Sequence, residues 1–273
     1  WWLNSYLHDR PELEPELVTP LPVQKQDRFN RYKKKRIQME KRRLVIVMHN
    51  DEPVSDRVQS YCVRNSIHPD IRKPFAGDTL GSPNESLVGT VILGGVQRVF
   101  DFEENPFLHE EYRWISECLE QGVPTLGICM GSQQLAYHLG AKIRIMDDNT
   151  CEFGYYEIFP TENGQEFLNQ PLTVAHSHFE YFDMPEGVVH LASSALCTNQ
   201  AFRYGDKVYG FQFHPERLIE GFELWQKMYG KERAGLPGVQ SHKEQTRLMH
   251  LHDAAQGKWF DAFLEGFFGS VHD

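Results

Sequence analysis

The sequence predicts an α/β fold built on a doubly wound, mostly parallel sheet with flanking helices. Two observations support this prediction. Short runs of β-branched and other apolar residues, typical of buried parallel strands, alternate with stretches of helical periodicity over residues 44–139. Residues 151–213 then read as a series of short strands, which predicts a smaller, β-rich sheet segment in addition to the parallel one.

Three apolar runs are the expected parallel strands: Leu44–Met48 (LVIVM), Val88–Leu93 (VGTVIL) and Pro124–Ile128 (PTLGI). A Pro- and Gly-rich segment that ends at Pro83 precedes the second run and is expected to be a loop. Helices are expected at Val54–Asn65, Leu108–Gln121 and Ser132–Leu139. The later strands are expected at YYEIFP, LTVAHS, VVHLASS, AFRYG and KVYGFQF.

The last part of the chain reads as two helices joined by a loop. Residues 218–230 (LIEGFELWQKMYG) have helical character, and residues 234–245 (AGLPGVQSHKEQ) are expected to be a loop. An aromatic, amphipathic run follows over residues 252–268. We expect this final helix to pack against the sheet, with a partner-docking face as the alternative.

Charge divides the chain into two parts. Residues 1–43 hold 11 Lys/Arg and 6 Asp/Glu, a net charge of +5, and the rest holds 17 against 32, a net charge of −15. We therefore expect residues 1–43 to be an extension with a basic, helix-capable run, and residues 44–273 to be the main domain. A body this acidic argues against a nucleic-acid partner, although a basic run is also typical of a nuclear address.

The five cysteines of the chain are widely spaced and form no C-x-x-C pair. This pattern argues against a zinc site and a disulfide framework, so we predict no metal, no cofactor and a reducing, cytoplasmic location. No apolar run approaches the roughly 20 residues that a membrane span requires, and the first residues lack the order of a secretory signal. The cysteines are Cys62, Cys118, Cys129, Cys151 and Cys197.

One cysteine lies in a nucleophile-elbow pattern. An apolar strand leads into Gly127-Ile128-Cys129-Met130-Gly131, and a helix follows. Such a sharp turn strains the nucleophile's backbone, and the flanking glycines prevent clashes with neighbouring backbone. The turn also places the sulfur at a helix N-terminus, which favours the thiolate. The alternative, a buried apolar cysteine, accounts for none of these neighbours.

A candidate base follows a later apolar strand, in VYGFQFHPE. His214 and Glu216 are two residues apart on an extended segment, so their side chains point the same way, and Pro215 keeps the segment extended. A cysteine nucleophile needs a base, and the base needs a partner on its other ring nitrogen. The 85 residues from Cys129 to His214 mean that only the fold can join them.

The third element is Gly94-Gly95 at the end of the second predicted strand. Ligands of open α/β sheets bind at such ends, and a Gly-Gly turn can offer an N–H to an oxyanion. An ordinary strand-ending turn is the alternative. Together the three elements resemble the class I, triad-type glutamine amidotransferase family over residues 44–216. HSHFEYFDMPEGVVHLASS and NQAFRYG resemble its stand-alone subgroup, similar to the glutaminase domain of GMP synthase.

The resemblance implies a flavodoxin-like fold and a role for each matching position. Cys129 is implied to attack the side-chain amide of glutamine, giving a γ-glutamyl thioester and ammonia, with His214 as base and Glu216 orienting it. The oxyanion N–H groups are implied to be those of Gly95 and Met130. The residues implied to bind the substrate's amino-acid end are Gln133, Ser177, His178 and Phe179.

Three functional readings follow. The chain lacks a P-loop and an SGGxDS-type loop, so a glutaminase of this kind would release ammonia for a separate synthetase or other ammonia-accepting protein. Val96 replaces a common Pro, so the loop after Gly94-Gly95 is expected to be less rigid. Phe179 replaces a common Gly, and the changed loop at 177–180 is consistent with the alternative, a γ-glutamyl peptide or conjugate hydrolase with a more open pocket. A non-catalytic regulatory module is the third reading, and the intact Cys-His-Glu set argues against it.

Overall fold

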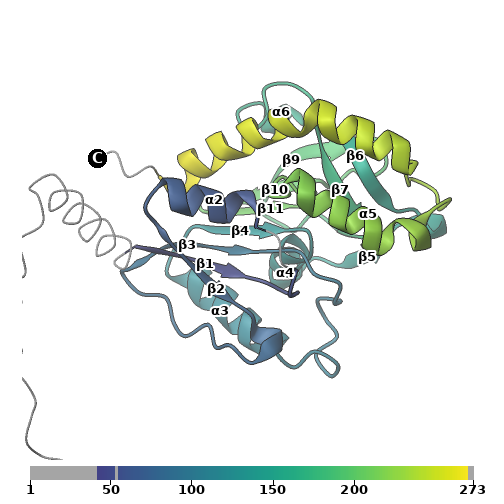
Figure 1. The fold of residues 1–273 in the computed structure, drawn as a ribbon. Coiled ribbons are helices and arrows are strands. Elements are labelled where there is room, and N and C mark those ends of the chain that lie inside the picture. Colours follow the sequence, from purple (N-terminus) through teal and green to yellow (C-terminus); the bar gives the residue numbers. More distant parts are fainter. Residues whose placement is uncertain (1–41, 53–54, 270–273) are drawn as a thin grey trace, which may run out of the picture. The chain divides into compact units, whose positions relative to one another are not determined.

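The computed structural model describes residues 42–52 and 55–269, and Figure 1 shows their helices and strands. The basic run expected within residues 1–43 lies almost entirely outside them, so the division of the chain at residue 43 stays a prediction.

The strands are β1 (Arg43–Val47), β2 (His68–Arg72), β3 (Leu87–Ile92), β4 (Thr125–Ile128), β5 (Ile143–Ile145), β6 (Glu152–Pro160), β7 (Leu172–His178), β8 (Glu180–Phe182), β9 (Val189–Ser194), β10 (Ala201–Tyr204) and β11 (Val208–Phe211). The helices are α2 (Arg57–Arg64), α3 (Leu108–Glu120), α4 (Met130–His138), α5 (Ile219–Arg233) and α6 (His242–Phe268), with 3-10 turns η1 (Pro74–Ala76), η2 (Asp147–Asn149) and η3 (Glu162–Gly164).

Nine strands form one sheet in the order β2-β1-β3-β4-β11-β10-β9-β6-β7, and β5 pairs with β8 in a separate two-stranded sheet. The pairs from β2 to β11 are all parallel, and those from β11 to β7 are antiparallel. The predicted α/β class is confirmed. The β-rich segment continues the parallel sheet through β10, β9, β6 and β7.

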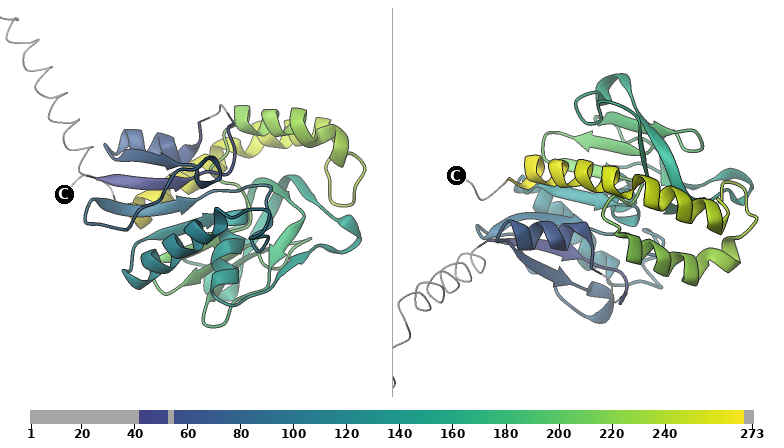
Figure 2. Two further views of the ribbon diagram at one scale, coloured as in Figure 1. Left: turned by 90° about the horizontal axis from the view of Figure 1, so that it is seen from below. Right: turned by 45° about the horizontal axis from the view of Figure 1, so that its top comes forward.

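Helices cover both faces of the parallel part, because side chains alternate along each buried strand. On β1, Leu44 and Ile46 join a core that includes residues of α2 and α6. Val45 and Val47 join the opposite core, with Trp114 of α3 and residues of α4. Figure 2 shows the two faces from different sides. The continuous apolar runs of the sequence therefore correspond to strands buried on both faces.

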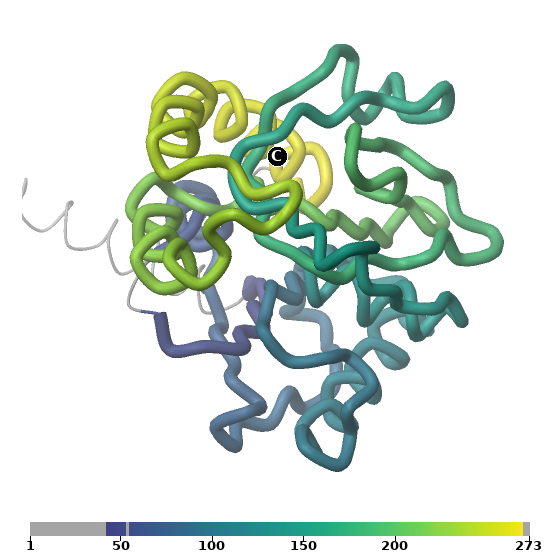
Figure 3. The backbone as a smooth tube through the Cα atoms, turned by 90° about the vertical axis from the view of Figure 1, so that its right-hand side faces the viewer, coloured from purple at the N-terminus to yellow at the C-terminus, as the bar shows by residue number. Residues whose placement is uncertain are grey.

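The two C-terminal helices lie side by side, as Figure 3 shows. Gln226 of α5 donates a hydrogen bond to Gln245 of α6 at 3.0 Å, and both side chains are buried. Phe222 and Trp225 of α5 pack in a third core with Phe153 of β6. The final helix packs against the sheet as expected, with Phe260, Leu264 and Phe268 in the same core as Leu44 and Ile46 of β1.

Two sequence predictions about element positions were wrong. Residues 68–72 fall in the segment expected to be a loop, yet they form edge strand β2, paired in parallel with β1. Pro69 needs no ladder N–H at a sheet edge, so the proline misled the prediction. Helix α6 begins at His242, inside the expected loop, because Ser241 caps it by accepting the backbone N–H of Glu244.

Two glycines allow β4 and α4 to meet at a sharp angle. A Cβ at Gly131 would collide with the backbone oxygen of Ile92, and one at Gly127 with the backbone oxygen of Gly131. Backbone cannot move aside as a flexible side chain can. The close approach of the elbow to β3 therefore depends on the missing side chains.

We predict that Gly131→Ala lowers the free energy of unfolding by about 1–3 kcal/mol, because overpacking here forces backbone apart. Urea denaturation measures the change. Gly230→Ala is the matched control, since Gly230 lies in α5 with no atom near its added Cβ, and the helix favours alanine. Equal stability of Gly131→Ala and the wild type would contradict the packing argument.

Candidate active site

Three loops meet at the carboxyl edge of the parallel strands. Strand β4 lies between β3 and β11, with Gly127 opposite Ile92 and Ile128 opposite Phe211. Cys129 is one residue beyond the end of β4, and His214 is three residues beyond the end of β11. Neighbouring parallel strands end at the same edge, so the fold brings together groups that are 85 residues apart.

The backbone of Cys129 has φ 52° and ψ −110°, in a region that non-glycine residues rarely adopt. Its N–H donates to the carbonyl of Phe211 at 2.7 Å, and its carbonyl accepts from the backbone N–H of Gln133 and the hydroxyl of Ser132. These bonds tie the strained turn to β11 on one side and to the first turn of α4 on the other. The side chain is 6% exposed, so the sulfur lies near the surface of the core.

His214 lies in a fixed orientation beside the cysteine. Its Nδ1 is 2.8 Å from Oε1 of Glu216, and its backbone N–H donates to the carbonyl of Ala175 at 2.8 Å. The ring also packs edge-on against Trp225, with centroids 4.6 Å apart. Since Nδ1 faces Glu216, Nε2 is the ring nitrogen left free to act toward Cys129.

The charges of these groups stabilise one another. Burial alone would lower the pKa of His214, but the charges of Glu216 and Cys129 raise it to about 9. Burial alone would raise the pKa of Glu216, but His214 holds it below its usual range. The arrangement therefore favours a protonated imidazole next to an ionised carboxylate at neutral pH.

A glutamine that sequence reasoning missed completes the surroundings of the sulfur. Gln212 donates from Nε2 to Sγ of Cys129 at 3.6 Å, while its Oε1 accepts from Gln133 at 3.2 Å. Gln133 donates also to the carbonyl of Glu180 at 3.0 Å. Side chains at every second position of an extended segment lie on the same side, so Gln212 shares the side of His214 and Glu216. The spacing that identified His214 and Glu216 is therefore the signal that could have identified Gln212.

The Gly-Gly turn after β3 lies directly against the cysteine and the histidine. A Cβ at Gly94 would be 2.8 Å from Cε1 of His214 and 3.4 Å from Cβ of Cys129. One at Gly95 would be 2.6 Å from Sδ of Met130. The structure thus brings together the two residues, Gly95 and Met130, whose N–H groups were expected to face an oxyanion.

Helix α2 holds the His-Pro-Glu segment from behind. The backbone N–H of Arg57 donates to the carbonyl of Glu216 at 2.9 Å, and its side chain donates to the carbonyls of Pro215 and Arg217. The same guanidinium pairs with Asp253 of α6 at 2.7 Å. One arginine therefore fixes three successive carbonyls beside the candidate base.

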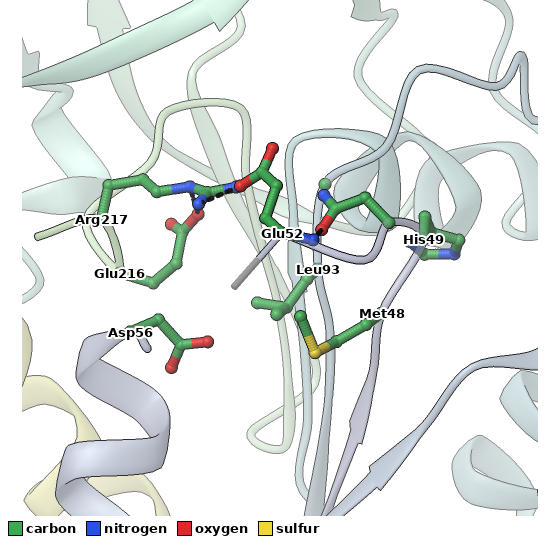
Figure 4. A pocket seen from close by; sticks show the side chains of 9 residues that line it. Met48, His49, Glu52, Asp56, Leu93, Glu216 and Arg217 are labelled. Carbon is green, nitrogen blue, oxygen red and sulfur yellow. Dashed lines mark hydrogen bonds and ion pairs between the residues drawn. The ribbon is translucent and has the colours of Figure 1, made fainter. Parts of the chain in front are cut away.

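A small cavity of about 20 Å³ adjoins this segment, lined by residues that include Asp56, Gly94, Glu216 and Arg217 (Figure 4). Arg217 pairs with Glu52 across it, and Glu52 also accepts a hydrogen bond from the indole of Trp225. The volume suits a single water molecule. Cys129 does not line this cavity. The residues around the cavity therefore support Glu216 and do not form the binding site for a substrate at Cys129.

Of the residues expected to bind substrate, Gln133 lies in α4, and the other three lie at or just after the end of β7 and point to different sides. Ser177 accepts a hydrogen bond from Arg233 at 2.8 Å. His178 faces the other way, with Nε2 2.8 Å from Glu152 and Nδ1 3.0 Å from the carbonyl of Glu180. Phe179 lies under the guanidinium of Arg233. Binding by these residues stays a prediction.

Glu152, His176 and His178 form a buried cluster of potential metal ligands, of which sequence reasoning singled out His178 alone, and for substrate binding. Their ligand atoms all lie within 4.8 Å of one another, as in a metal site. Ser194 and Gln200 already donate to the carboxylate of Glu152. Burial alone would raise the pKa of Glu152, but the two histidines hold it well below its usual range, so a hydrogen-bonded cluster around an ionised carboxylate also accounts for the arrangement.

A strained cysteine at a strand-to-helix turn, next to a His–Glu pair, is the arrangement of an α/β protein with a nucleophile elbow. The chain belongs to the class I glutamine amidotransferase family, since the family model described as "Glutamine amidotransferase class-I" matches residues 70–222. This match confirms the resemblance stated from the sequence.

The sequences of individual relatives agree with this family assignment. The glutamine amidotransferase-like protein YfeJ of Salmonella typhimurium is 32% identical over 157 residues, 55% of this chain and 65% of that protein. GMP synthase of Bacillus subtilis is 30% identical over 165 residues, 60% of this chain but 30% of that protein. The chain thus spans less than two thirds of the length of either relative.

Among solved structures, a glutamine amidotransferase from Thermotoga maritima superposes with a TM-score of 0.74 at 26% identity, covering 84% of this chain and 99% of that one. One from Methylobacillus flagellatus gives the same TM-score at 23% identity, covering 81% and 91%, and supports the fold alone. Within the described residues, no helix is both long and apolar enough to cross a membrane.

We predict that Arg57→Gln lowers the free energy of unfolding by about 2–3 kcal/mol, because it leaves buried carbonyls and Asp253 without their charged partner. Arg64→Gln is the control: Arg64 pairs with Asp261 between the same two helices, but both side chains are exposed. That pair is expected to contribute less than about 1 kcal/mol. Urea denaturation compares them, and equal losses would contradict the role given to Arg57.

Proposed function

We propose that this protein hydrolyses the side-chain amide of glutamine through a γ-glutamyl thioester on Cys129 and releases ammonia. The observation that best supports the proposal is that the Gly94 turn adjoins both a backbone-strained cysteine and His214, which is itself paired to Glu216 at 2.8 Å. A thiolate, a protonated imidazole and an orienting carboxylate are the groups that cysteine-dependent amide cleavage requires.

In the first step, the sulfur of Cys129 attacks the amide carbon of the substrate. The carbonyl oxygen becomes an oxyanion, and the N–H groups of Gly95 and Met130 stabilise it. His214 gives its proton to the leaving nitrogen, the C–N bond breaks, and ammonia departs. The C–S bond that remains is the γ-glutamyl thioester.

In the second step, His214 accepts a proton from water as the water attacks the thioester. The C–S bond breaks and leaves the electron pair on the sulfur of Cys129, while His214 keeps the proton, so both groups regain their starting charges. The new carboxylic acid loses its own proton to solvent and leaves as glutamate. Glu216 keeps the ring in place through both steps, and Trp225 holds it from the other side. Gln133, Ser177, His178 and Phe179 are proposed to hold the amino-acid end.

A second candidate is hydrolysis of γ-glutamyl peptides or conjugates by the same chemistry. Val96 is 75% exposed beside a pocket of about 330 Å³ that it lines with residues of α5, such as Met228 and Tyr229. A pocket of this size next to the proposed oxyanion loop has room for a leaving group larger than ammonia. Ammonia and amine release from glutamine and from γ-glutamyl amides distinguish the two.

We further propose that residues 44–273 form the amidotransferase domain, and that ammonia passes to a separate synthetase or another acceptor. GMP synthase, one relative, carries glutamine hydrolysis in its name and is much longer than the matched region. A cytoplasmic location fits the five cysteines, all of which are free. Co-purification of an ammonia-dependent synthetase tests the partner.

We predict that Cys129→Ala abolishes ammonia release, by at least about a thousandfold, since the thioester cannot form. The fold should remain intact, which circular dichroism and urea denaturation verify. Cys118→Ala is the control, because Cys118 is buried in the core far from the loops of the site. Turnover in Cys129→Ala at wild-type rate would show that another residue is the nucleophile.

The pKa of about 9 for His214 predicts the pH dependence of turnover. The leaving nitrogen needs the protonated ring, so kcat/KM should hold below pH 9 and fall as pH rises through it. Glu216→Gln removes a carboxylate that raises this pKa, so the basic limb should move to lower pH. Glu244→Gln, on the exposed start of α6, should leave the profile unchanged. If the basic limb of the kcat/KM profile stayed in place in Glu216→Gln, Glu216 would not be the group that raises the pKa of His214.

A further inference from the structure

Arg233, in the last turn of α5, is enclosed by aromatic rings. Its guanidinium lies 5.0 Å from the ring centroid of Phe153, 5.1 Å from that of Phe179 and 4.5 Å from that of Tyr229. Its Nη1 donates to the hydroxyl of Ser177 at 2.8 Å. Stacking on several rings and one hydrogen bond fix the planar group in place, as binding of an anion in a defined geometry requires.

The positive charge of Arg233 has no carboxylate partner within residues 42–52 and 55–269. Its one side-chain hydrogen bond there is to a neutral hydroxyl, whereas Arg57 and Arg217 nearby pair with Asp253 and Glu52. A guanidinium has five N–H donors, so several remain for another acceptor. The side chain is half-buried, which leaves it open to a ligand while water screens it less than at the surface.

The position of Arg233 relates it to the candidate site through two elements. The end of β7 that carries Ser177 is tied to the site on both sides: the carbonyl of Ala175 accepts the backbone N–H of His214, and the carbonyl of Glu180 accepts from Gln133. Ser177 lies between these two attachments. The guanidinium therefore adjoins the segment proposed to hold the substrate's amino-acid end.

Helix α5 makes the second connection. Trp225, Tyr229 and Arg233 are spaced by four residues, so they lie along one face of the helix. Trp225 packs on the ring of His214, and Tyr229 packs on Arg233. One helix face thus runs from the candidate base to the guanidinium of Arg233.

We propose that Arg233 binds the α-carboxylate of the γ-glutamyl substrate and makes that free carboxylate a requirement for cleavage. The inference rests on the proposed function. The α-carboxylate is the anionic group that glutamine and every γ-glutamyl conjugate share, and a guanidinium recognises it through paired N–H donors. A glutamine side chain inside a polypeptide has an amide there instead, so it would be rejected.

The test compares L-glutamine with L-glutamine α-amide, which lacks only the charged carboxylate. Arg233→Gln should raise KM for glutamine on the order of tenfold to a hundredfold, and should change kcat/KM for the α-amide by less than about threefold. Arg233→Lys should restore part of the discrimination because it keeps the charge. Arg247→Gln, exposed on α6 and paired with Glu244, is the control and should change neither.

Binding of L-glutamate, measured by calorimetry against L-glutamate α-amide, separates this proposal from the proposed function. Wild-type turnover with equal losses on both substrates in Arg233→Gln would overturn the role of Arg233 alone. A wild type without turnover that still binds glutamate in an Arg233-dependent way would overturn the proposed function alone. Neither turnover nor glutamate binding by the wild type would overturn both.

Discussion

The parallel pairing of β4 with β3 on one side and β11 on the other is the constraint on which the site depends. This register places Cys129, the Gly94-Gly95 turn and the segment 212–216 at one edge of the sheet. The bond from the N–H of Cys129 to the carbonyl of Phe211 extends the ladder one step into the elbow. A shift of either strand by one residue would turn its side chains to the other face.

The geometry of the site is reinforced by layers of contacts around a few ionisable groups. Glu216 and Cys129 offset the burial of His214, and the ring is held between Glu216 and Trp225. The carbonyls of the same segment are bound by Arg57, which joins α2 and α6. The charged groups are thereby kept in a buried site, where electrostatic interactions are stronger than in water.

Local sequence patterns were sufficient to predict the parts of the site. Glycines on both sides of Cys129 and the spacing of His214 and Glu216 indicate backbone conformations that short-range sterics decide. That these parts meet depends on β4 and β11 being neighbours in the sheet, which no local pattern specifies. The family resemblance supplied that information, and the family match supports it.

Other residues were beyond sequence reasoning for physical reasons. Arg57 is one of many arginines, and its importance comes from carbonyls that lie 158 and 160 residues away. Glu152 and Arg233 likewise acquire their surroundings from strand pairing and helix packing. Gln212 is the exception, because it shares the alternation of His214 and Glu216. The position of β2 was missed because prolines are unusual in strands except at an edge.

The most direct measurement is mass spectrometry of the protein quenched in acid during turnover of glutamine. A γ-glutamyl group on the peptide that contains Cys129, lost on alkaline treatment and absent from Cys129→Ala, is the expected result. Release of ammonia and glutamate with no adduct on that peptide, or with the adduct on another residue, would contradict the assignment of Cys129 as the nucleophile.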